Sequence, residues 1–239
     1  MRKFVSTLML LVILMSLAIP VHCAQAAVNE IRPDFTVSVS KMKKDISKYS
    51  VSVTVKGSQQ RFAFRPSEIK KFTVRSKTYS KKIETVKATV LIDRKVATVR
   101  ADVTIKYKYT GNGWKLYTVG FGKTSLNSID LKGTWNGTYV AYQGKTKVKI
   151  IIRSVTRDGF ISSGTFNFSA VPTNPSVPSG SYTLKGGYDR QTGEVVFAGN
   201  EWLVHPSGYI FIEIHAWVDL VNKKIVSGSN SWYLDIRKN

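Results

Sequence analysis

The sequence predicts a mainly β protein with two parts, a small α+β domain followed by an antiparallel up-and-down β-barrel of about eight strands. Three observations lead to this prediction. Apolar and polar residues alternate through most of the chain, glycine-containing turns separate the alternating segments, and the composition changes near Asp130. Period-two alternation is typical of a strand with one buried face, and short turns join antiparallel neighbours.

The first 26 residues have the pattern of an export signal. Arg2 and Lys3 precede an almost wholly apolar run from Phe4 to Ile19, and Ala24-Gln25-Ala26 matches the motif that signal peptidase reads. The run is shorter than the roughly 20 residues of a membrane-spanning helix, so we favour cleavage over a retained anchor. We therefore expect a secreted protein, or one on the extracellular face of the cell envelope.

Reactive groups are scarce after this signal. Cys23 is the only cysteine and lies inside it, so the mature chain has no thiol for a disulfide or a nucleophile. His205 and His215, with Glu213 nearby, have no recognisable ligand spacing, so we expect no metal and no cofactor. No nucleophile elbow, phosphate loop or dinucleotide motif occurs. We expect no catalytic residues and a protein that is not an enzyme, although contact between Glu213 and His215 in a cleft would favour one.

Residues 27–129 are predicted to form the basic α+β domain. Short helices are expected at 41–49 and 66–72, and Thr110 to Gly113 should form a hairpin turn. The alternating segments predict strands at 35–39, 51–55, 86–92, 99–105 and 116–119.

Positive charge is concentrated in this first part. Residues 27–130 contain 22 Lys and Arg against 8 Asp and Glu, whereas 131–239 contain 12 against 7. Such a field attracts polyanions, and a merely solubilising surface is the alternative. Without an aromatic stacking platform, specific nucleic-acid binding is not expected, which leaves an anionic cell-wall polymer or acidic polysaccharide. The candidate polyanion-binding residues are Lys70, Lys71, Arg75, Lys77, Lys81, Lys82, Arg94 and Lys95.

The region from about 70 to 120 resembles a small extracellular domain of Gram-positive envelope proteins. The resemblance is carried by a Lys-rich strand from Phe72 to Lys77, a Val/Thr strand from Val86 to Ile92, and a closing hairpin between Val103 and Leu116. It implies a cystatin-like or nuclear-transport-factor-like α+β fold and brings no diagnostic chemistry.

Residues 130–239 are predicted to form the barrel. Asp158-Gly159, Asp189 to Gly193 and Asn222-Lys223 are turn signals, and closure of the sheet would leave no exposed edge. The eight predicted strands are 132–141, 146–155, 160–169, 180–188, 194–200, 208–219, 223–229 and 231–237.

The barrel region also resembles an uncharacterised domain of exported bacterial proteins. The shared pattern opens with Gly133-x-Trp135-x-Gly137-x-Tyr139 and continues through Gly164-Thr165-Phe166 to Trp202 and Pro206 to Tyr209. Its opening strand is similar to the first strand of avidin- and lipocalin-type barrels. That similarity implies a lumen lined by Trp135, Tyr139, Phe166 and Trp202, although core packing is favoured for Trp135 and Tyr139 because small barrels are filled by their own side chains.

A second candidate ligand surface lies on the predicted strand 208–219. Alternation places Ile210, Ile212, Ile214, Ala216 and Val218 on the core face. The other face carries Tyr209, Phe211, Glu213, His215 and Trp217, a strip suited to a sugar or a protein partner. Packing of these aromatic residues, with reversed phase or under the first half of the chain, is the favoured alternative.

These observations predict a non-catalytic binding module whose basic domain associates with anionic envelope polymers. The runner-up is a barrel carrier of a small apolar or aromatic ligand, which a solidly packed lumen would exclude.

Overall fold

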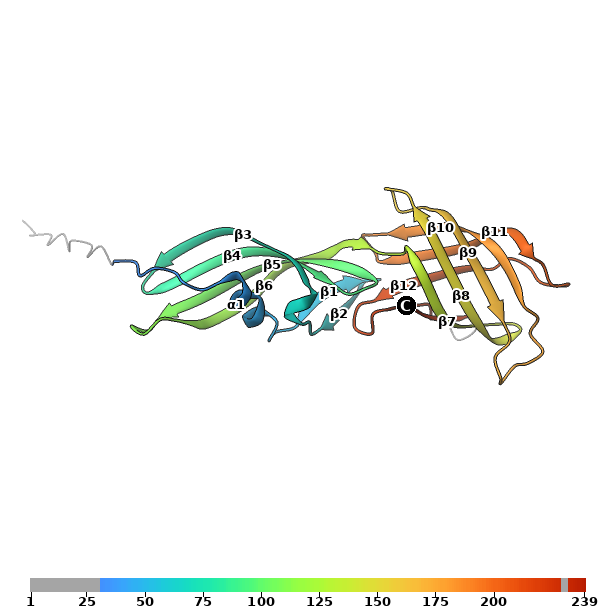
Figure 1. The fold of residues 1–239 in the computed structure, drawn as a ribbon, viewed down its shortest axis with the longest axis horizontal. Coiled ribbons are helices and arrows are strands. Elements are labelled where there is room, and N and C mark those ends of the chain that lie inside the picture. Colours follow the sequence, from blue (N-terminus) through green and yellow to red (C-terminus); the bar gives the residue numbers. More distant parts are fainter. Residues whose placement is uncertain (1–30, 229–231) are drawn as a thin grey trace, which may run out of the picture. The chain divides into compact units, whose positions relative to one another are not determined.

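The computed structural model describes residues 31–228 and 232–239, so the predicted export signal lies outside the described residues. Within these ranges the chain is mainly β, with one α-helix, one short 3-10 helix and fourteen strands. Eight of the strands form a closed antiparallel barrel, which confirms the predicted fold class (Figure 1).

The first part of the described chain contains a helix, a hairpin and a sheet. Helix α1 is followed by the β1–β2 hairpin, the 3-10 helix η1 and four long strands that pair in the order β3-β4-β5-β6. The bounds are α1 (Val39–Ile46), β1 (Val51–Val55), β2 (Ser58–Phe62), η1 (Pro66–Glu68), β3 (Ile69–Ser80), β4 (Ile83–Asp93), β5 (Ala97–Tyr109) and β6 (Trp114–Ile129).

Local capping explains two differences from the sequence prediction. The Ser38 hydroxyl accepts a hydrogen bond from the backbone N–H of Lys41, which starts α1 at Val39, so the predicted strand 35–39 is wrong. Phe35 instead packs against the rings of Tyr107 and Trp114. The predicted helix 66–72 shrinks to one 3-10 turn, because β3 begins at Ile69 and pairs with β4.

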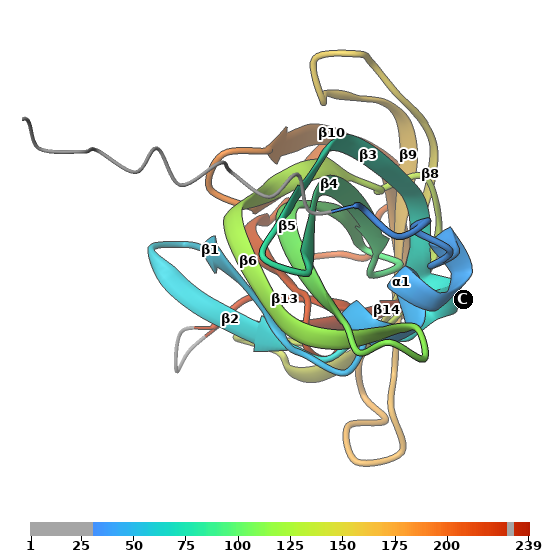
Figure 2. The ribbon, with the colours of Figure 1, turned by 90° about the vertical axis from the view of Figure 1, so that its left-hand side faces the viewer.

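One face of the four-stranded sheet is covered and the other is open. Buried apolar residues alternate along β4 and β5 from Val86 to Ile92 and from Val99 to Ile105. Helix α1 contacts β3, and β1 lies beside β6, so these elements help to cover that face (Figure 2). Polar residues occupy the alternate positions, as the pleat requires, and form the open face.

The second part is the barrel. Its strands follow one another around the wall, and β14 pairs with β7 to close it. Most predicted strand bounds agree with the observed ones to within two residues. The observed strands are β7 (Gly133–Ala141), β8 (Gly144–Val155), β9 (Ile161–Ser169), β10 (Gly180–Asp189), β11 (Glu194–Val204), β12 (Glu213–Asp219), β13 (Lys224–Val226) and β14 (Tyr233–Lys238).

A glycine allows the two ends of the barrel sheet to meet. Gly137 on β7 lies opposite Ile236 on β14, and a Cβ at Gly137 would stand 1.9 Å from the Asp235 carbonyl oxygen. A side chain at this position would therefore push the closing strands apart.

The barrel is irregular where β12 begins and β13 ends. The predicted strand 208–219 is present from Glu213 onward, so its first five residues are loop. Strand β13 ends at Val226, before the predicted end at 229. As a result β12 pairs with β13 only from Trp217 to Asp219, while its beginning pairs with β11.

The predicted boundary between the two parts falls in the short segment between β6 and β7. Residues Arg32–Asn239 form one compact unit by their contacts, and the division into two domains stays a prediction. The buried guanidinium of Arg94 is one contact across this boundary. It donates to the carbonyls of Ala63, Leu220 and Val221 and is ion-paired with Glu68.

Candidate functional site

The candidate ligand site of the barrel lies at the end where β7 turns into β8 and where the β11–β12 loop ends. A cavity of about 320 Å³, here called the mouth cavity, opens there. Its lining consists of Tyr139, Tyr142, Gln143, Phe168, Tyr182, Gly208, Tyr209, Ile210, Ile212 and Trp232. The lumen is therefore hollow at this end, although large side chains fill the rest of it.

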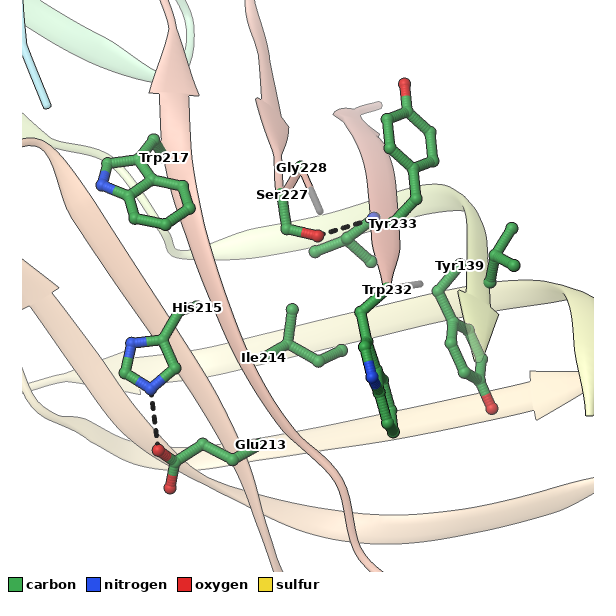
Figure 3. Close-up of a pocket in the computed structure, with 11 residues that line it drawn as sticks. Tyr139, Glu213, Ile214, His215, Trp217, Ser227, Gly228, Trp232 and Tyr233 are labelled. Carbon is green, nitrogen blue, oxygen red and sulfur yellow. Dashed lines mark hydrogen bonds and ion pairs between the residues drawn. The ribbon is translucent and has the colours of Figure 1, made fainter. Parts of the chain in front are cut away.

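A second hollow, here called the wall cleft, has a volume of about 300 Å³ and shares Tyr139 and Trp232 with the mouth cavity. It lies where β12 has no β13 partner. Ile214 points from β12 toward Trp232, while His215 and Trp217 lie on the other side of the strand (Figure 3). The irregular pairing of β12 thus produces an opening in the barrel wall.

Stacked rings hold the inner wall of the mouth cavity in place. Tyr182 lies parallel to Phe166 with ring centres 4.8 Å apart, and the edges of Trp202 and Phe211 complete its surroundings. Tyr209 is stacked on Phe168 at 5.4 Å. Aromatic pairs prefer particular orientations, so these contacts hold the rings in place in addition to burying their surface.

Four tyrosines line the mouth cavity, and two of them, Tyr139 and Tyr182, have buried phenol groups. Gln143 Nε2 donates a hydrogen bond of 2.5 Å to the Tyr139 hydroxyl. Burial raises the pKa of Tyr139 to about 12, against the effect of hydrogen bonds from Thr146 and Gln143. Burial and the nearby Tyr139 also raise the pKa of Tyr182 far above its usual value. Both groups therefore remain neutral hydrogen-bond donors near pH 7.

The structure distributes the four predicted lumen residues over three environments. Trp135 and Phe166 are fully buried in the packed core, and the Trp135 indole donates to the Leu131 carbonyl. Tyr139 lines both hollows. Trp202 lies partly exposed between Phe211 and His205, with stacked ring centres at 4.9 and 4.4 Å.

The strip predicted on 208–219 is divided in the same way. From Glu213 onward the inward and outward positions alternate as predicted, because Ile214, Ala216 and Val218 are buried. Tyr209 belongs to the mouth cavity, and Phe211 packs on Trp202 instead. Lys56 lies over the Trp217 ring, 3.4 Å from its centre. The five residues therefore do not form one continuous surface.

His215 lies between two carboxylates. Its Nδ1 is 2.8 Å from Glu194 Oε1 and its Nε2 is 2.9 Å from Glu213 Oε1. Glu194, followed by Glu213, raises the pKa of His215 because both stabilise the charged imidazolium. The contact that would favour an enzyme is thus present, and Glu213 and His215 both line the wall cleft, yet more than half of each side chain is exposed to water.

The open face of the β3–β6 sheet is the second candidate site. Register places six cations on it, and a hydrogen bond to Thr89 places Arg75 there too; all seven side chains are exposed. These residues, here called the basic face, are Lys71, Arg75, Lys87, Arg100, Lys106, Lys108 and Lys115. Two carboxylates share the face: Asp93 is ion-paired with Lys70, and Asp102 accepts from Thr89, which accepts from Arg75.

Only part of the predicted basic cluster belongs to this face. Lys71 and Arg75 lie on it and Lys70 is ion-paired at its border, whereas Lys77 lies over the Phe35 ring on the covered side. Arg94 is buried, with 4% of its surface exposed, so it is not available to a polyanion. The remaining predicted lysines occupy tight turns; they are Lys81, Lys82 and Lys95.

Sequence reasoning missed five residues of the basic face, from Lys87 to Lys115. The signal was present in β5, where Arg100, Lys106 and Lys108 alternate with buried apolar residues. The pairing that aligns them with Lys71 and Lys115 involves other strands and could not be read from that segment.

Comparison with known proteins adds no assignment, because no family, curated protein or solved structure matches the chain. No helix within the described ranges has both the length and the apolar character needed to cross a membrane. In the same residues, His, Asp and Glu side chains form no group of three or more that could hold a metal ion.

Proposed function

We propose that the protein is a non-catalytic binding protein whose basic face associates with an anionic polymer at the outer surface of the cell. The observation that carries this proposal is the gathering of seven exposed cations on one uncovered sheet face. An open face with several exposed cations can contact a chain of repeated negative charges at several points at once. The secreted or envelope location is part of the same proposal and is supported by the signal pattern of residues 1–26.

The charges on this face are not balanced within the described residues. None of the seven has an ion-pair partner there. Lys108 and Lys115 stand directly opposite each other on β5 and β6, an arrangement that destabilises a sheet. A bound polyanion would remove this repulsion, so binding and fold stability are coupled at this pair.

A matched pair of triple variants tests this proposal. One replaces Lys106, Lys108 and Lys115 by Gln, and the other replaces Lys145, Lys147 and Lys149 by Gln on the outer surface of β8. Both lose three positive charges. Binding to purified wall polymer at low and high salt should fall steeply with salt and should be much weaker for the first variant.

The controls separate surface recognition from net charge. An equal loss of binding in the two triple variants would mean that total charge attracts the polymer without a defined face. Binding that does not depend on salt, or no binding by the unmodified protein, would exclude the proposal.

A second candidate function is that of a carrier for a small apolar or aromatic ligand. The mouth cavity favours it, because the lumen is not filled at that end. Titration of the protein with small aromatic probes, followed by the NMR signals of the cavity residues, tests this function directly. We do not propose an enzyme, because the Glu194–His215–Glu213 group is exposed to water, and the other residues that line the wall cleft beside His215 and Glu213 are mainly apolar and aromatic.

A further inference from the structure

The mouth cavity has a lining without charge. Its ten lining residues are aromatic and aliphatic side chains together with one amide and one glycine. A charged ligand would lose its hydration there without gaining an ionic partner. The lining therefore selects for an uncharged molecule.

One polar group of the cavity lacks a partner. Only 2% of the Tyr182 surface is exposed, and its hydroxyl forms no hydrogen bond with any described residue. The fully buried side-chain atoms without a partner do not include this hydroxyl, so it reaches the surface of the cavity, where water or a ligand oxygen can accept its proton. Phe166, Trp202 and Phe211 hold the ring, so the hydroxyl cannot readily turn elsewhere to find an acceptor.

A second phenol lies close to the first. The Tyr139 hydroxyl accepts from Gln143 Nε2 and is also hydrogen-bonded to Thr146, whose own hydroxyl donates to the Gly144 carbonyl. Phe166 contacts both rings, so the two phenols lie in the same part of the lining. The Tyr182 hydroxyl therefore supplies the free neutral donor, which suits a carbonyl or ether oxygen on a ligand.

The remaining walls suit a flat ring. Phe168 and Tyr209 form one stacked pair, and Tyr142 meets Trp232 edge to face with ring centres 5.2 Å apart. A volume of about 320 Å³ lies at the lower end of the range for small-molecule sites, so one or two rings fill it.

We propose that the mouth cavity binds a small, uncharged aromatic molecule and that the Tyr182 hydroxyl donates a hydrogen bond to an acceptor oxygen on it. The inference rests on the carrier function and specifies its ligand class. The ring of the ligand lies between the stacked pair and Trp232.

The rim of the cavity supports entry of such a molecule from solvent. Tyr142 and Ile210 are 93% and 79% exposed, and both line the mouth cavity. Exposed apolar side chains at the rim of a hollow are typical of ligand-binding grooves. They would become covered when the cavity is filled.

Three nearly isosteric probes test the proposal with the full chain: ethylbenzene, acetophenone and benzoate. They share one ring and differ in having no acceptor, a neutral acceptor or a negative charge. Protein NMR titration should show acetophenone binding roughly tenfold more tightly than ethylbenzene, the effect of one hydrogen bond, and no binding of benzoate in the cavity.

Two variants assign the selectivity to one hydroxyl. Tyr182→Phe should bind ethylbenzene as before and lose the preference for acetophenone. Tyr188→Phe is the matched control, because Tyr188 is on the same strand but lines neither hollow, and it should keep the preference. Ile212→Trp should fill the cavity and abolish binding of every probe.

The outcomes separate the inference from the carrier function. If ethylbenzene and acetophenone bind equally, or if Tyr182→Phe keeps the preference, the inference is overturned while the carrier function stands. If no probe binds the unmodified protein, both are overturned. Preferential binding of benzoate would also overturn the inference, since it would require a cation that the lining does not contain.

Discussion

The β3–β6 sheet and the barrel deal with the edges and faces of a sheet in opposite ways. In the four-stranded sheet, β3 and β6 are edge strands and one face is open to solvent. Many of the residues on these edges and on the open face are Lys, Arg, Thr and Ser. The barrel removes its edges by pairing β14 with β7 and encloses one face completely. Charged edge residues also discourage pairing with other chains, so they serve the open sheet in two ways.

This difference explains where each part can bind. An open face carries charge at little cost because water still surrounds the side chains, and it suits a long polymer. A closed barrel has binding groups inside only where its packing is incomplete. The irregular start of β12 and the early end of β13 provide such a place beside Tyr139 and Trp232.

The largest expected change in stability comes from replacing a glycine at the closing seam of the barrel, compared with a glycine in the open sheet. Gly137→Ala should destabilise the protein by about 3 kcal/mol, because its Cβ would collide with the Asp235 backbone at the closing seam. Gly120→Ala on β6 meets no atom within 4 Å and should leave stability unchanged or raise it by up to about 1 kcal/mol. Urea unfolding measures both, and equal effects would contradict closure through β7 and β14.

The next largest difference in stability is expected between variants of a buried and an exposed arginine. Arg94→Gln removes one of the two cations paired with Glu68 and leaves three carbonyl groups without their donor, so it should cost about 2 kcal/mol. Arg100→Gln on the basic face should change stability by no more than about 0.5 kcal/mol, since Arg100 is exposed. Thermal unfolding of the two variants at one protein concentration provides the measurement. A harmless Arg94→Gln would show that the contact between the two parts contributes little.

A smaller effect of opposite sign is expected on the basic face. Lys108→Thr should stabilise the protein by about 0.2–1 kcal/mol, because it removes the repulsion from Lys115 across the strand pair. Lys147→Thr on β8 faces Thr138 and Ser169 and should give no such gain. The gain should disappear in high salt, as screened repulsion does. A loss of stability in Lys108→Thr would contradict the register of β5 and β6.

The smallest effect concerns pH. Glu194 and Glu213 raise the folded-state pKa of His215, so the pairing stabilises the fold below the unfolded pKa of about 6.5, and this contribution disappears as pH rises through the folded pKa. Glu194→Gln should lower the pKa of His215 more than Glu213→Gln, because Glu194 is the larger cause. NMR titration of the imidazole signals measures this. An unchanged His215 titration in both variants would show that the pairs do not persist in solution.

Much of the strand pattern could be predicted from local alternation. The barrel strand predicted at 180–188 is observed at Gly180–Asp189, and the one predicted at 160–169 at Ile161–Ser169. Alternation failed at 208–212, where Ile210 is 79% exposed, because the pattern continues into a loop that has no strand partner. Hydrophobic periodicity predicts which residues would share a face of a strand. It does not predict whether a neighbouring strand is present to pair with it.

The candidate sites depended more on distant contacts. Arg94 looks like its basic neighbours in the sequence, yet Glu68 and the carbonyls of Leu220 and Val221 bury it. Trp135 and Tyr139 share a face of β7 as predicted, but one fills the core and the other lines a cavity. Their different roles come from their depth in the barrel, which seven other strands determine.

The strand alternation, the turns, the excess of positive charge in the first part and the signal pattern of residues 1–26 can all be read along the chain. These are local properties, because pleating, turn geometry and composition involve residues close together in the chain. The set of cations that share the basic face and the position of the hollow in the barrel follow from the folded arrangement instead. Both depend on the register of strands far apart in sequence, which places Lys108 opposite Lys115 and leaves the start of β12 without a partner on one side.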